Sequence, residues 1–194
     1  PDKCFNGYTL FWQGRQVRLI DMNGRMANEW QMDMERMTDH VGRGRLLPNG
    51  NVLVQRGGMM SETGGLQEYD WSGKLVWQWV PENISPHREY LGPHHDVYRK
   101  DDGNTLTICR HAVPEERLKA VRNPLWQNQT IYEDAILEID REGRVLWNWH
   151  GYEHLDLNHY RITASPDWFA GPYNSTVCDW MHVNTVQALP ENKW

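Results

Sequence analysis

The stretch EIDREGRVLWNW, residues 138–149, decides the fold because the chain carries three closely similar copies of it. The other two are LIDMNGRMANEW at residues 19–30 and EYDWSGKLVWQW at residues 68–79. Each copy has an Asp, a Gly three residues later, then a basic residue, and a Trp at its end. Asp starts tight turns by accepting hydrogen bonds from the backbone ahead of it, and Gly takes the positive φ that such turns need. Each copy is therefore predicted to be an antiparallel hairpin, with its β-branched and aromatic flanks as strands.

A second hairpin signal alternates with the first. Asn49-Gly50 lies within LLPNGNVLV, and Asp102-Gly103 lies within VYRKDDGNTLTI. Asn-Gly and Asp-Gly between apolar runs are among the strongest short hairpin signals. A third copy begins in VNTVQALPEN at residues 183–192. The predicted hairpins cover residues 17–30, 45–54, 66–79, 95–108 and 136–149.

Two alternating hairpins make four antiparallel strands per repeat, at intervals of roughly 50 to 70 residues, which is typical of propeller blades with loop insertions. We therefore predict an all-β fold, a β-propeller of four-stranded antiparallel blades with about three blades represented. A β-sandwich with coincidental turns is the alternative that three ungapped matches disfavour. Residues 1–194 are interpreted as one partial propeller domain. It comprises a half blade at 17–30, a blade at 44–80, a blade at 94–150 and the start of the next blade at 182–194.

Propellers close with about four to eight blades, so we expect the polypeptide to continue or to be completed by another chain. The 11 Trp residues against 3 Phe favour packing between layered sheets. That role is predicted for the residues Trp30, Trp77, Trp79, Trp147 and Trp149. A net charge of −6 disfavours nucleic acid as a partner, and no apolar run is long enough for a membrane span.

The cysteines, Cys4, Cys109 and Cys178, have no metal or redox spacing. One disulfide would leave one thiol over, and the spacing does not decide the pairing. Sequons at Asn83, Asn128 and Asn174 are a hint of glycosylation and an extracellular location.

Five stretches together resemble the arylsulfotransferase (aryl-sulfate sulfotransferase) family, and the resemblance runs over essentially the whole chain. They are GYTL at 7–10, RLIDMNG at 18–24, LLPNGN at 46–51, HHDV at 94–97 and DWMHVN at 179–184. The resemblance implies a six-bladed propeller with its active site in the central channel. It also implies an exported, PAPS-independent enzyme without a cofactor. Such enzymes move a sulfuryl group from a phenolic sulfate ester to another phenol through a sulfated histidine.

The resemblance carries over to individual residues. His182 and Asn184 match the His-x-Asn of the family that binds sulfate oxygens, and His95 is similar to another channel histidine. The predicted catalytic residues are therefore His95 and His182, and the predicted substrate-binding residues are His182, Asn184 and Trp180, whose indole would stack on an aromatic substrate. Imidazole and amide N–H groups suit the charged oxygens of a sulfuryl group. The nucleophilic histidine and a sulfate-binding arginine of the family lie in later blades and match no residue here.

Two histidine groups raise the question of a metal. Neighbouring residues on a strand point to opposite faces, so His94 and His95 are poor joint ligands. A structural alternative to a catalytic role is that His94 caps a turn and that Asp96 holds a neighbouring histidine in one tautomer. The spacing of His150, His154 and His159 fits no zinc pattern, so no metal is predicted.

Two alternatives to the sulfotransferase stay open. One is a non-catalytic binding or structural propeller that keeps the scaffold of the family. The other is a different propeller enzyme, such as a lyase or a quinoprotein, since one fold hosts many functions. The segment 109–131, which interrupts a blade, is interpreted as a charged, solvated loop over one mouth of the channel.

Overall fold

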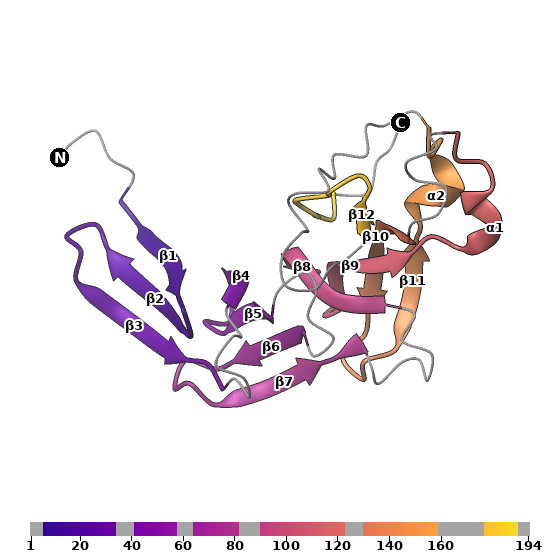
Figure 1. Cartoon of the computed structure of the whole chain (residues 1–194). Helices are drawn as coiled ribbons and strands as arrows, with labels where there is room; N and C mark the ends of the chain where they lie inside the picture. Colours follow the sequence, from indigo (N-terminus) through magenta and orange to yellow (C-terminus); the bar gives the residue numbers. More distant parts are fainter. Residues whose placement is uncertain are drawn as a thin grey trace.

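The computed structural model describes residues 6–33, 41–57, 64–81, 90–122, 130–158 and 177–189 (Figure 1). The first sheet contains β1 (Tyr8–Gln13), β2 (Gln16–Asp21) and β3 (Met26–Gln31). The second contains β4 (Val41–Leu46), β5 (Val52–Arg56), β6 (Gly65–Tyr69) and β7 (Leu75–Trp79). The third contains β8 (Tyr90–Arg99), β9 (Thr105–Ala112), β10 (Thr130–Ile139) and β11 (Val145–Trp149), with β12 (Val177–Asp179) parallel to β10. The helices α1 (Glu115–Leu118) and α2 (Gly151–His154) are one turn each.

All five predicted hairpins are confirmed by antiparallel pairing within the three sheets. The turns form for the predicted reason. The Asp21 carboxylate accepts the backbone N–H groups of Asn23 and Arg25 at 2.8 and 2.9 Å, and Gly24 has a φ of 76°. The second sheet is a four-stranded meander, as expected for a propeller blade, and the third has the same meander in β8 to β11 with β12 added beside β10.

The first sheet has a strand that the repeat did not reveal. The strand β1 pairs with β2 through a two-residue turn at Gly14, whose φ is 60°. The predicted half blade at residues 17–30 is therefore part of a three-stranded sheet.

Tryptophans at the ends of β3 and β7 join each sheet to the next. The Trp30 indole donates to the Asp70 carbonyl at 2.8 Å, and the Trp79 indole donates to the Gly143 carbonyl at 3.2 Å. Trp77 likewise donates to the Arg141 carbonyl at 2.9 Å. The closing residues of one hairpin therefore bind the Asp-x-x-Gly turn of the next blade, which confirms the predicted packing role of these three residues.

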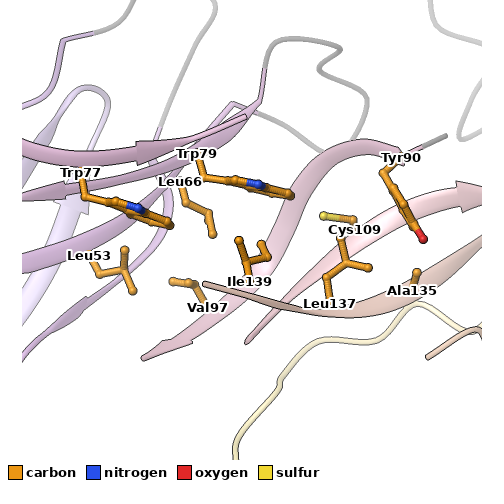
Figure 2. Packing of buried hydrophobic residues seen from close by; sticks show 10 residues of the cluster. All are labelled: Leu53, Leu66, Trp77, Trp79, Tyr90, Val97, Cys109, Ala135, Leu137 and Ile139. Atoms are coloured by element: carbon orange, nitrogen blue, oxygen red, sulfur yellow. The ribbon is translucent and has the colours of Figure 1, made fainter. Parts of the chain in front are cut away.

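The main core lies between the second and third sheets. Figure 2 shows Trp77 and Trp79 beside Leu53, Leu66 and residues of the third sheet. The members from the third sheet are Tyr90, Val97, Cys109, Ala135, Leu137 and Ile139. Cys109 is a free, fully buried thiol, and burial raises its pKa well above the ordinary range.

Trp147 and Trp149 differ from their repeat partners. Trp147 is 50% exposed, and Trp149 stacks on His154 with the ring centroids 5.2 Å apart. Their packing between blades stays a prediction. No helix in the part of the chain that the structure describes is long and apolar enough to cross a membrane.

The segment 181–189 forms no strand. Val183, Val186 and Ala188 instead pack on Leu106 and Ile108 of the third sheet. The start of a further blade at 182–194 stays a prediction, and residues 190–194 lie outside the described residues.

Candidate functional site

The His-His-Asp motif lies in a distorted part of β8. The register of β8 against β9 shifts between His94 and Val97, and His95 has a φ of 61°. The two neighbouring rings approach to 5.0 Å with an interplanar angle of 81°, so the predicted alternation to opposite faces does not hold. The left-handed backbone at the bulge is the physical reason, because it redirects the side chain that follows His94.

The structure brings His95 and His182 together. Their ring centroids are 4.8 Å apart, although the two residues belong to different segments of the chain. His182 and the preceding Met181 also have positive φ values, 53° and 81°. Non-glycine residues seldom adopt this conformation, and strained residues of this kind gather at functional sites.

The buried carboxylate of Asp134, on β10, connects both histidine segments. Its Oδ1 lies 3.0 Å from Nε2 of His94, and both side chains are almost completely buried. It also accepts a short hydrogen bond from the backbone N–H of Val183, next to His182. One side chain therefore fixes the spacing between the two motifs.

The Asp96 carboxylate holds the same two segments at a second point. It accepts hydrogen bonds from the Thr185 hydroxyl at 2.8 Å, the Val186 N–H at 3.1 Å and the Arg45 guanidinium at 2.9 Å. The predicted partner, a neighbouring histidine, is therefore wrong for the described residues. Burial alone would raise the pKa of Asp96, but the donors from Arg45, Thr185 and Val186 keep the pKa below its ordinary value.

The two other predicted substrate-binding residues differ in exposure. Asn184 is exposed, and its amide donates to the His182 carbonyl at 2.8 Å. Trp180 is fully buried in a cluster with Val113, Ile131 and Leu157. That burial leaves no free indole face, so the expected stacking of Trp180 on a substrate gives way to packing.

The environment of His95 favours a neutral ring. Burial lowers the pKa of His95 below 6.5, and the charges of His94 and His182 lower it further, against an opposing effect of Asp134. The charge of Arg43 on β4 also lowers the pKa of His95. Sequence reasoning missed Arg43 because no motif marks it; only the contact between β4 and β8 brings it near. The site can therefore offer a nitrogen lone pair beside cationic groups.

A second histidine group lies elsewhere on the third sheet. His150 has Nδ1 at 2.7 Å from Glu133 Oε1, and His111 has Nδ1 at 3.2 Å from the same oxygen. Of the three histidines considered for their spacing, only His150 belongs to this group: His154 is exposed, and His159 lies outside the described residues. His111 is buried within β9, which corrects the interpretation of 109–131 as wholly a solvated loop.

Comparison with known proteins identifies the family of the chain. The family model described as Arylsulfotransferase (ASST) matches residues 8–193. The chain belongs to the arylsulfotransferase family. A solved structure titled "Structure of Dos1 propeller" is similar with 10% identity and a TM-score of 0.30, covering 73% of this chain and 44% of that one. The chain thus spans less than half the length of that structure, and none of the curated proteins matches it.

Proposed function

We propose that this chain forms part of a PAPS-independent aryl sulfotransferase, in which His95 and His182 line the site that binds the sulfuryl group (the sulfuryl site). The observation that carries the proposal is the 4.8 Å approach of the two rings, both on left-handed backbone. The family membership supports a phenolic substrate, because arylsulfotransferases act on phenolic sulfate esters.

Each group has a role in this proposal. The sulfur–oxygen bond of the donor ester breaks as a nucleophilic histidine takes the sulfuryl group, and an acceptor phenol later receives that group. The nucleophile lies outside the matched motifs of this chain. His182 and Asn184 hold the sulfuryl oxygens, where N–H donors stabilise developing charge. His95, which is neutral near pH 7, takes the proton of the acceptor phenol or binds the same group.

The buried carboxylates support this assignment as positioning residues. Asp134 and Asp96 bind the backbone on both sides of Asn184, at Val183 and Val186. A site held at two points keeps its donors in place, which is what electrostatic stabilisation requires.

The test is transfer by the full-length protein from an aryl sulfate ester to a second phenol, without a nucleotide donor. We expect release of the first phenol together with an equal amount of the new ester. Inactivity of the intact protein across several aryl sulfates and phenols would contradict the proposal.

A non-catalytic binding or structural propeller is the second candidate. A later channel histidine and an arginine in the full-length protein would favour the enzyme, and their absence there would favour this candidate. Sulfate binding at His95 and His182 without any turnover would support this candidate over the enzyme.

We also propose export to the periplasm or the extracellular space, as is usual in the family. The sequons at Asn83, Asn128 and Asn174 lie outside the described residues. The remaining blades, in the same or a separate chain, are the expected partner.

A further inference from the structure

Three chemically reactive side chains converge on the face of β10 opposite Asp134. Glu133 precedes Asp134 on the strand, so alternation sends its side chain to the other face. His111 of β9 is the register partner of Glu133, and His150 follows β11. All three residues are buried, and one ligand atom from each lies within 4.8 Å of the others.

The distances from Glu133 to the two histidines are close to those of a metal site, and the two histidine nitrogens lie within 4.8 Å of each other. Nδ1 of His111 and Nδ1 of His150 lie 3.2 and 2.7 Å from the same oxygen, Oε1 of Glu133. Tetrahedral zinc with bonds of about 2.0 Å places its ligand atoms about 3.3 Å apart. The His111 spacing already fits, and His150 needs a shift of about half an ångström to fit.

We propose that His111, Glu133 and His150 bind a divalent zinc-like ion, with water as the fourth ligand. Two imidazoles and one carboxylate suit zinc and neighbouring transition metals. Calcium and magnesium instead prefer sites built from oxygen alone.

Hydrogen bonds around the cluster already orient two of the three ligands, Glu133 and His150. The Glu133 oxygen that faces away from the histidines, Oε2, accepts the Tyr152 N–H at 2.9 Å. Nε2 of His150 lies 3.2 Å from the Tyr90 hydroxyl, to which Asn148 donates at 3.1 Å. Metal-binding histidines commonly donate their second N–H to such a partner. Glu133 and His150 therefore already have outer partners of the kind that a metal site uses.

The cluster also lies close to the segment that carries His182. A Cβ on Gly151 would come 2.3 Å from Met181 Sδ and 3.2 Å from Glu133 Oε2, so only glycine allows this close packing. Met181 directly precedes His182. An ion here would therefore connect α2 to the support of the sulfuryl site.

The test is zinc titration of the full-length protein after chelation, by calorimetry and elemental analysis. We expect one zinc per chain at this site, and imidazole nitrogen NMR of the wild type should show two histidines ligating through Nδ1. The NMR measurement needs no variant, so it holds even if substitutions in the cluster prevent folding.

Variants then locate the ion. Glu133→Gln should lose the zinc, and Tyr90→Phe should weaken binding about 10-fold, as expected for an outer partner. The control His154→Ala changes an exposed histidine near the cluster and should bind as the wild type does. No Nδ1 ligation in the wild type, or full binding by a folded Glu133→Gln, would overturn the proposal and leave a purely hydrogen-bonded network.

Discussion

His95, Met181 and His182 hold backbone conformations that L-amino acids seldom adopt. Among the described residues they are the three non-glycine positions with positive φ. Each costs about 1–3 kcal/mol and persists only where surrounding contacts fix it. Here the fixing contacts come from Asp134 and Asp96, which bind the backbone of the His182 segment. The rings of His95 and His182 are thereby held 4.8 Å apart and tilted by 56° to each other, at a cost in stability.

Replacing His182 by Ala in the full-length protein removes a donor to the sulfuryl oxygens. Because those contacts strengthen as charge develops, we expect kcat to fall about 10²- to 10³-fold. Steady-state transfer between an aryl sulfate and a phenol measures the loss. His154→Ala is the matched control, and wild-type turnover in His182→Ala would remove His182 from the mechanism.

The pKa of His95 sets an expectation for pH dependence. Since its folded pKa lies below 6.5, the ring loses its proton as pH rises through that lower value and is neutral above it. If His95 acts as a general base, kcat/KM should rise with pH as the ring loses its proton, with the midpoint of this rise below pH 6.5. At neutral pH, kcat/KM should no longer change. His95→Gln should abolish the rise. A rise that persists unchanged in that variant would assign the titration to another group.

At the scale of elements, one hairpin with its Trp makes the contact between blades. The sequence predicts these hairpins because Asp, Gly and Trp lie close together in the chain. It does not predict the approach of His111 to Glu133 and His150, since strand register and the turn before α2 create that cluster. The sequence does not predict the bulge in β8 for a similar reason. The local sequence predicts a regular strand, and tertiary contacts override that preference.

Trp79 is expected to stabilise the fold far more than Trp147, which lies in the next copy of the repeat. Trp79 is 2% exposed and donates to the Gly143 carbonyl, whereas Trp147 is 50% exposed. Trp79→Ala should reduce the free energy of unfolding by about 3–5 kcal/mol, as for other buried aromatic residues. Trp147→Ala should change it by only about 0.5 kcal/mol if no further blade covers that residue. Denaturant unfolding of the full-length variants measures both, and equal losses would show that another blade packs on Trp147.

At the scale of the whole molecule, the sheets repeat one arrangement. Two strands of the first sheet, β1 and β2, contact β4, which is the first strand of the second sheet. In the same way β5 and β6 of the second sheet contact β8, which is the first strand of the third sheet. The first sheet is thus equivalent to β5–β7, and within the described residues it lacks a counterpart of β4. Figure 1 shows the three sheets following one another in chain order. A closed propeller would place a strand from elsewhere beside β1.

We therefore predict that residues 1–194 expressed alone do not form a soluble, cooperatively unfolding monomer. Within the described residues, β1 and β11 each have one edge without a paired strand, and these edges would pair with other chains. Light scattering after size exclusion, with denaturant unfolding, provides the measurement. A stable monomer with a single sharp transition would show that these edges need no cover.

The central claim is that His95 and His182 form one anion site. Sulfate titration of the full-length protein, followed by NMR of selectively labelled imidazoles, tests it most directly. We predict that the signals of His95 and His182 shift together along one saturable curve, with a common Kd, while the exposed His154 gives no saturable response. Separate affinities for the two rings, or no response from either, would contradict the account.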